Sequence, residues 1–272
     1  MTRAGSGSRA PIGVFDSGLG GLTVVRALMA RMPHESFLYF GDTARVPYGP
    51  KSPETIRRYS REITTYLRDE GVKAVVVACN TATAHALSML RDELSIPVIG
   101  VVEPGARAAA EATRTRRVGV IGTAGTIGSG AYERAIHTRR PDVQVVARAC
   151  PLFVPLVEEG WLDTPATRLI AREYLSPLSD DGIDTLVLGC THYPLLQSVI
   201  AEAMGSSVQL VDSADAAAAE TAAVLCKAGL AAAESARPTS RFIASDAPEQ
   251  FLRAGQRFLG AAIERVETVT LG

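Results

Sequence analysis

The chain has 272 residues, of which 47% are apolar and 21% are charged, and its formal net charge is −1 at pH 7. This length and apolar content are enough to fill the core of one large domain or of two modest ones. The near-zero charge supplies no general electrostatic attraction to nucleic acid or to an anionic membrane, so we expect neither as a partner. A small acidic metabolite remains compatible with the composition, because local groups could bind it.

The chain contains four cysteines, Cys79, Cys150, Cys190 and Cys226. They are too few and too widely spaced for a disulfide-stapled secreted domain, and no Cys-x-x-Cys pair is present. No apolar segment of signal-peptide length precedes the first expected strand, and charged residues interrupt the Ala-rich segment 214–230. We therefore expect reduced thiols in a cytoplasmic protein, with residues 1–10 as a disordered tail.

The first half of the chain repeats a pattern of strand, turn and helix. An apolar run at 12–15 leads into the glycine-rich turn 16–21, after which apolar residues at helical spacing begin at Leu22. Glycines in such a turn let backbone N–H groups face a carboxylate or a phosphate at the helix N-terminus. The third glycine of a dinucleotide fingerprint is absent, because Thr23 stands in its place. Further strands are expected at 37–40, 74–78 and 97–101, and helices at 52–70 and 82–94.

A second set of strands follows and resembles the first as a weak internal repeat. Its first strand, 117–121, again leads into a glycine-rich turn. We therefore expect an α/β protein of two pseudo-symmetric, doubly wound domains with mostly parallel sheets. Residues 11–101 and 213–272 would form the first domain, and residues 102–212 the second. The remaining expected elements are strands at 143–147, 185–189, 208–211 and 241–245, an Ala-rich helix from 214, and a helix at 248–259.

Cys79 and Cys190 stand at matching places in the two halves. Each follows a short apolar run, 74–78 or 185–189, and each is followed by polar side chains. In sheets covered by helices on both faces, ligands bind beyond the carboxyl ends of the strands. Both thiols would then face one substrate in the cleft between the domains. A cysteine after an apolar run is often only a small buried hydrophobe, so for this pair both interpretations stay open.

Two thiols related in this way suit a reaction that is symmetric about one atom, such as racemisation. One group removes a proton from one face of a carbon while the other delivers a proton to the opposite face. A thiol, with an ordinary pKa of about 8.5, can serve as base or acid once its neighbours adjust it. Asp16 is placed to orient Cys79. His192, with Glu158 as its partner, is placed to assist Cys190. Side chains able to hold carboxylates and an ammonium group are Ser17, Asn80, Thr81, Thr123, Thr126 and Thr191.

The sequence predicts a reaction without a cofactor or a metal ion. Pyridoxal phosphate, the usual helper of amino-acid racemisation, needs a lysine for its Schiff base. Lys73 precedes a strand, Lys227 lies in the Ala-rich helix and Lys51 lies in a Pro- and Gly-rich loop, so none has the expected placement. Cys190 and His192 have Cys-x-His spacing, which is not an ordinary metal-ligand pattern.

Four blocks of sequence resemble the glutamate racemases, cofactor-independent enzymes of the aspartate/glutamate racemase superfamily. The resemblance extends over nearly the whole chain from Ile12, and its blocks are residues 13–24, 41–49, 79–83 and 189–196. It implies two α/β domains with the site between them, and interconversion of L- and D-glutamate to supply D-glutamate for peptidoglycan. It also implies a homodimer.

The same resemblance implies roles for individual residues. Cys79 would take the α-proton from D-glutamate with the help of Asp16. Cys190 would take it from L-glutamate, and His192 with Glu158 would assist. Substrate contacts would come from Asp16, Ser17, Tyr48, Gly49, Asn80, Thr81, Thr191 and His192. Tyr48 lies in a Pro- and Gly-rich loop, so capping of the core is an equal alternative for its side chain.

Two other functions remain open at this stage. A sister racemase or isomerase would use the same thiols on aspartate, a hydantoin or maleate. The four blocks argue against it, and a comparison of L-glutamate with L-aspartate turnover would decide. Some glutamate racemases are also reported to inhibit DNA gyrase, which makes gyrase a candidate partner. A variant without both thiols that still inhibited supercoiling would show that such a role is independent of catalysis.

Overall fold

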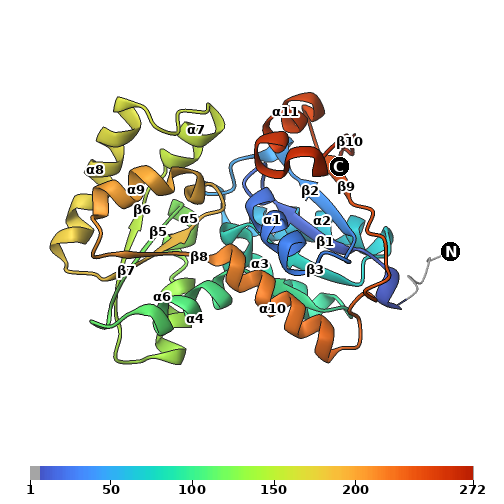
Figure 1. Cartoon of the computed structure of the whole chain (residues 1–272), viewed down its shortest axis with the longest axis horizontal. Coiled ribbons are helices and arrows are strands. Elements are labelled where there is room, and N and C mark those ends of the chain that lie inside the picture. The colour runs from blue at the N-terminus through green and yellow to red at the C-terminus, as the bar shows by residue number, and fades with distance from the viewer. Residues whose placement is uncertain (1–6, 272) are drawn as a thin grey trace.

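The computed structural model describes residues 7–271, which form two parallel β-sheets side by side with helices around them (Figure 1). The first sheet has six strands in the order β10-β9-β2-β1-β3-β4, and the second has four in the order β6-β5-β7-β8. All neighbouring strands in both sheets are parallel. This arrangement confirms the predicted fold class of two α/β halves.

The first sheet has β1 near its centre, between β2 and β3. Every residue of these three strands is buried, as expected for apolar runs in a parallel sheet covered on both faces. The strands of this sheet are β1 (Ile12–Asp16), β2 (Phe37–Gly41), β3 (Ala74–Val77), β4 (Val98–Gly100), β9 (Arg241–Ala244) and β10 (Glu267–Thr268).

The second sheet repeats the central arrangement of the first. Here β5 lies between β6 and β7, just as β1 lies between β2 and β3. Its strands are β5 (Arg117–Gly122), β6 (Gln144–Ala149), β7 (Thr185–Gly189) and β8 (Gln209–Asp212). Since β7 is the counterpart of β3, the residues that follow these two strands occupy equivalent places in the two halves.

Local sequence signals set several helix boundaries. The side chain of Ser52 caps α2 by accepting a hydrogen bond from the Thr55 amide, and Pro53 occupies the first turn, where no intrahelical N–H is needed. The helices before β5 are η1 (Gly7–Arg9), α1 (Leu22–Arg31), η2 (Thr43–Arg45), α2 (Pro53–Asp69), α3 (Asn80–Glu93) and α4 (Val102–Ala112). Those between β5 and β8 are α5 (Ala124–Gly128), α6 (Ala131–Arg139), α7 (Phe153–Glu158), α8 (Pro165–Asp180), η3 (Tyr193–Leu196) and α9 (Gln197–Met204).

The C-terminal segment returns to the first sheet. After β8, α10 (Ser213–Lys227) packs against α1 and α4, and α11 (Pro248–Leu259), followed by η4 (Gly260–Ala262), packs against α1. Between them, β9 pairs with β2 and extends the sheet, so the late elements in orange and red lie beside the early ones in blue (Figure 1). One apolar core therefore joins Leu22 of α1 to Leu225 of α10 and Phe251 of α11.

Residues 1–6 of the expected disordered tail lie outside the described residues. In the rest of that segment, Gly7–Arg9 form η1, and the Ser8 carbonyl accepts a hydrogen bond of 2.7 Å from Lys73 Nζ. Over residues 7–271, no helix is long and apolar enough to cross a membrane.

Candidate active site

Cys79 and Cys190 follow the carboxyl ends of β3 and β7, which are equivalent strands of the two sheets. Both side chains are nearly enclosed, with exposed fractions of 5% and 6%. Thr191, next to Cys190, donates a hydrogen bond of 3.2 Å to Asp16 Oδ2 at the end of β1, the strand beside β3. The structure thus joins the segment of Cys190 to the end of β1, the strand beside the one that Cys79 follows, across the boundary between the halves.

The carboxyl group of Asp16 is fully buried at this boundary. Its oxygens accept hydrogen bonds from the Gly18 amide at 3.0 Å and from Thr191. Burial raises the pKa of Asp16, although the charge of His192 and these hydrogen bonds oppose the shift. Among the described residues no hydrogen bond joins Asp16 to Cys79, and the side chain that bonds this carboxylate is Thr191, next to Cys190.

The surroundings of Cys79 favour a neutral thiol. Its Sγ donates to Ser17 Oγ at 3.8 Å and accepts from the Ala82 amide at 3.4 Å, at the N-cap of α3. Burial raises the pKa of Cys79 to about 12, and the negative charge of Asp16 adds to the effect. At neutral pH this sulfur therefore carries its proton.

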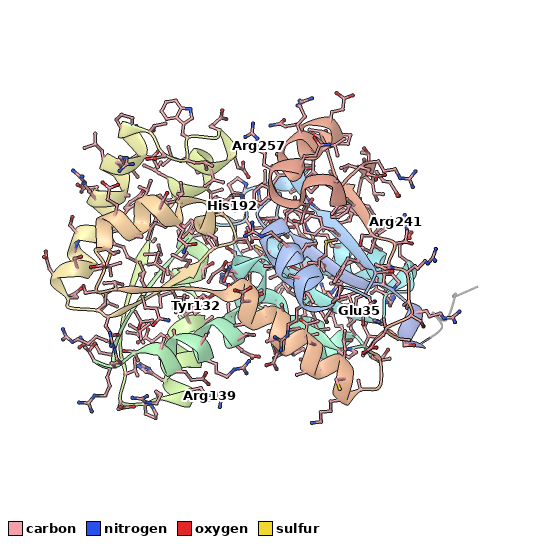
Figure 2. All side chains as sticks on the ribbon, viewed as in Figure 1. Glu35, Tyr132, Arg139, His192, Arg241 and Arg257 are labelled. Atoms are coloured by element: carbon pink, nitrogen blue, oxygen red, sulfur yellow. The ribbon has the colours of Figure 1, made fainter. Side chains whose placement is uncertain are left out.

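The surroundings of Cys190 are ionic instead. His192 Nδ1 lies 3.8 Å from Cys190 Sγ, and His192 Nε2 lies 3.2 Å from Glu158 Oε1 of α7. Burial lowers the pKa of His192, but its hydrogen bonds with Cys190 and Glu158 outweigh burial and raise this pKa to about 10. His192, which lies between the two halves (Figure 2), is therefore an imidazolium at neutral pH.

The glycine-rich turn after β1 lets the second half approach the first. A Cβ atom at Gly20 would lie 2.3 Å from Thr191 Oγ1 and 2.5 Å from His192 Nδ1. Any side chain at this position would push the glycine-rich turn away from the segment that carries Cys190. The glycines of this turn predicted anion binding, but the close approach could not be predicted, because no local pattern marks a contact with residues so far along the chain.

Three predicted substrate contacts form a cluster of buried threonines. Thr81 Oγ1 at the start of α3 lies 2.8 Å from Thr123 Oγ1 and 3.0 Å from Thr126 Oγ1. Thr123 also caps α5 by accepting a hydrogen bond from the Thr126 amide. Each hydroxyl has one donor and two acceptor positions, so the cluster can hold its own geometry and still bind a polar ligand.

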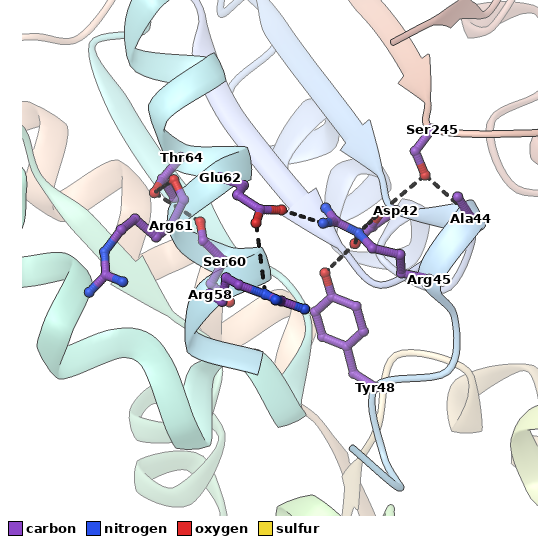
Figure 3. Close-up of polar contacts among 10 residues, drawn as sticks. All are labelled: Asp42, Ala44, Arg45, Tyr48, Arg58, Ser60, Arg61, Glu62, Thr64 and Ser245. Carbon is purple, nitrogen blue, oxygen red and sulfur yellow. Dashed lines mark hydrogen bonds and ion pairs between the residues drawn. The ribbon is translucent and has the colours of Figure 1, made fainter. Parts of the chain in front are cut away.

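The side chain of Tyr48 is buried away from solvent and is committed to a polar network (Figure 3). Its hydroxyl donates to Asp42, which also accepts from Arg45 Nε at 2.8 Å and from Ser245 Oγ of the C-terminal segment at 3.0 Å. The proton of the hydroxyl is thus already donated to Asp42. The backbone of Gly49 faces the second half instead, where its carbonyl accepts a hydrogen bond of 2.9 Å from the Gly125 amide.

Asn80 carries the one clearly unsatisfied donor of the predicted set. Its side chain is 2% exposed, and Nδ2 is buried without a hydrogen-bond partner among the described residues. A buried amide nitrogen in this condition is costly unless a ligand or water supplies an acceptor. In the described part of the chain, no group of three or more His, Cys, Asp or Glu side chains is arranged to hold a metal ion.

Two parallel β-sheets, each packed against helices, carry a pair of enclosed thiols at equivalent strand ends. Comparison with known proteins identifies the protein family that has this arrangement. The model of the Asp/Glu/Hydantoin racemase family matches residues 22–221. A glutamate racemase of Geobacter metallireducens is 56% identical over 265 residues, which cover 96% of either chain.

Solved structures agree. A glutamate racemase isoform of Bacillus anthracis superposes with a TM-score of 0.92 at 41% identity, covering 97% of this chain and 98% of its own. A glutamate racemase of Francisella tularensis, solved with D-glutamate, superposes with a TM-score of 0.91 at 39% identity and the same coverage. The chain therefore belongs to the Asp/Glu/Hydantoin racemase family, within its glutamate racemase branch, and is an amino-acid racemase.

Proposed function

We propose that the chain interconverts L- and D-glutamate by proton transfer between Cα and two cysteines, without a cofactor. The observation that carries the proposal is the pair of enclosed thiols at equivalent strand ends, one neutral and one beside an imidazolium. The substrate follows from the relatives, which are named glutamate racemases and one of which was solved with D-glutamate.

Cys190 acts as the base toward L-glutamate in this proposal. The ring of His192 lies against the sulfur through Nδ1, and Glu158 holds the ring in place through Nε2, so the ring can assist proton transfer to and from this cysteine. The thiolate takes the α-proton, so the Cα–H bond breaks and its electron pair stays on the substrate. A solvent-shielded site with fixed donors around the substrate carboxylate stabilises this carbanion.

Cys79 then acts as the acid. Its raised pKa keeps the sulfur protonated at neutral pH until the carbanion forms on the other side of Cα. Delivery of its proton to the opposite face yields D-glutamate and leaves Cys79 as the thiolate and Cys190 as the thiol. The reverse reaction starts from that state, with Cys79 as the base toward D-glutamate.

The polar residues around the thiols would bind the carboxylates and the ammonium group. Unpartnered Asn80 Nδ2 and the hydroxyls of the threonine cluster provide donors, and the buried carboxylate of Asp16 provides an acceptor. Because the thiols are 5% and 6% exposed, glutamate enters by separation of the halves at contacts such as Thr191 with Asp16. The product, D-glutamate, would supply peptidoglycan synthesis. The homodimer that the resemblance implies stays a prediction.

The direct test uses purified protein dialysed against a chelator and free of pyridoxal phosphate. Circular dichroism should show the ellipticity of either glutamate enantiomer falling to zero with time, and the ellipticity of L-aspartate changing far more slowly. A requirement for a metal ion or pyridoxal phosphate would overturn the cofactor-free mechanism. Turnover of L-aspartate at the rate of L-glutamate would overturn the assignment of the substrate.

A further inference from the structure

Tyr132 of α6, in the second half, reaches the residue that follows Cys79 in the first. Its side chain is 3% exposed, and its hydroxyl donates a hydrogen bond of 2.7 Å to Asn80 Oδ1. Figure 2 places Tyr132 near the start of α10, where the two halves adjoin. Burial raises the pKa of Tyr132, so the hydroxyl stays a donor throughout the working range of pH.

The ring of Tyr132 also lies against the segment that carries the other thiol. A Cβ atom at Gly189, the residue before Cys190, would lie 3.0 Å from Tyr132 Cε2. A single side chain therefore touches the residue after one thiol with its hydroxyl and the residue before the other thiol with its ring. Such a side chain can keep the two segments in a fixed relation.

In the structure, the hydrogen bond from Tyr132 accompanies one orientation of the Asn80 amide. Since the hydroxyl donates to Oδ1, this oxygen faces Tyr132 and Nδ2 faces away from it. Nδ2 is buried and has no partner among the described residues. The orientation thus holds an unused pair of N–H donors directly after Cys79, where a carboxylate oxygen of the substrate could accept.

We propose that Tyr132 is a positioning residue for the substrate: it fixes the amide of Asn80 so that Nδ2 donates to a carboxylate oxygen of glutamate. This inference rests on the proposed function. A tyrosine that served packing alone would contribute to folding, but its hydroxyl would have no reason to act on turnover through Asn80. If Tyr132 acts through Asn80, the effects of substitutions at the two residues on kcat/KM are not additive, whereas a role in packing alone predicts additive effects.

A double-mutant cycle on the full chain separates them. Tyr132→Phe should lower kcat/KM for glutamate about tenfold in the wild-type background, mainly through KM, because the carboxylate is bound throughout the reaction. In an Asn80→Ala background the same substitution should change kcat/KM less than about twofold. Tyr174→Phe is the matched control, since the Tyr174 hydroxyl accepts a hydrogen bond from the Leu152 amide, away from Asn80, and this variant should stay within about twofold of wild type.

Asn80→Asp provides a test that does not depend on the folding of a Tyr132 variant. The aspartate keeps an acceptor for Tyr132 but replaces the donor by an anion, so kcat/KM should fall further than in Asn80→Ala. An Asn80→Asp variant as active as Asn80→Ala, or equal losses from Tyr132→Phe in both backgrounds, would overturn the inference alone. A wild-type protein that does not racemise glutamate would overturn the proposed function and this inference with it.

Discussion

The two thiols occupy equivalent strand ends but lie in different electrostatic surroundings. Within residues 7–271, the hydrogen-bond partners of Cys79 are Ser17 Oγ and a backbone amide, and burial keeps this thiol neutral. Cys190 adjoins His192, which is held in turn by Glu158. The fold therefore supplies symmetry of position, while the neighbours of each sulfur decide which one starts as acid and which as base.

The largest effect is expected from removal of either sulfur, which tests whether both thiols take part in proton transfer. Cys79→Ala or Cys190→Ala deletes one of the two proton-transfer groups, and racemisation should fall by about 10³-fold or more. Steady-state assays with both enantiomers check it. Cys150→Ala is the control, because Cys150 is also fully buried but bonds only the Arg148 carbonyl, and it should stay within about threefold. A single-thiol variant that kept a tenth of wild-type activity would contradict two-cysteine chemistry.

A second substitution tests the asymmetry itself. His192→Asn removes the imidazolium beside Cys190, and kcat/KM should fall by about 10²-fold. Because L- and D-glutamate have equal free energies, kcat/KM must fall equally in both directions. The unequal assistance of the two sulfurs must therefore be measured by another quantity, the isotope effect. The isotope effect from deuterium at Cα should rise for L-glutamate, whose proton Cys190 takes, more than for D-glutamate. An equal rise for both enantiomers would contradict separate assistance of the two sulfurs.

The protonation state of His192 can be measured directly. The pKa of His192 is raised to about 10 in the folded state, against about 6.5 in the unfolded chain. At pH 8 the ring should therefore carry a proton on both nitrogens in the folded protein and be neutral in the urea-unfolded chain. The ¹⁵N chemical shifts of the ring nitrogens measure this, and the His192→Asn variant assigns the signal. The shifts of a neutral imidazole at pH 8 in the folded protein would contradict an imidazolium beside Cys190.

The smallest effect is expected outside the thiol pair. Tyr48→Phe removes the hydroxyl bonded to Asp42, but that carboxylate keeps Arg45 and Ser245 as partners. Stability should fall by about 1 kcal/mol, with turnover within about threefold of wild type. Urea denaturation and steady-state kinetics measure the two quantities. A tenfold loss of turnover at unchanged stability would mean that the hydroxyl contacts substrate after all.

Sequence patterns could predict the features that are local. The apolar runs at β3 and β7 identify buried strands. Cys79 and Cys190 follow these strands and therefore lie at equivalent edges of the two sheets. For these strands and their cysteines, a period or a boundary signal within one segment carries the information. The joining of the C-terminal segment to the first domain was instead expected from the resemblance to the glutamate racemases, because the pairing of β9 with β2 joins residues far apart in the chain.

Contacts between distant segments could not be predicted in this way. The bonds of Asp16 with Thr191 and of Tyr132 with Asn80, and the approach of His192 to Gly20, depend on how the two halves dock. No local period encodes that docking. The alternative roles of Tyr48 likewise depended on Asp42 being buried beneath the loop, which the sequence of the loop does not reveal.

Isotope transfer in deuterated water tests the central claim most directly. L-glutamate should give D-glutamate that carries deuterium at Cα from its first formation, while recovered L-glutamate still carries protium, and D-glutamate should give the mirror result. This follows because the thiol that takes the proton is not the thiol that delivers one. Chiral separation followed by mass spectrometry measures both pools. A product that retained the substrate's own α-proton, or recovered substrate that gained deuterium as fast as the product, would contradict the account.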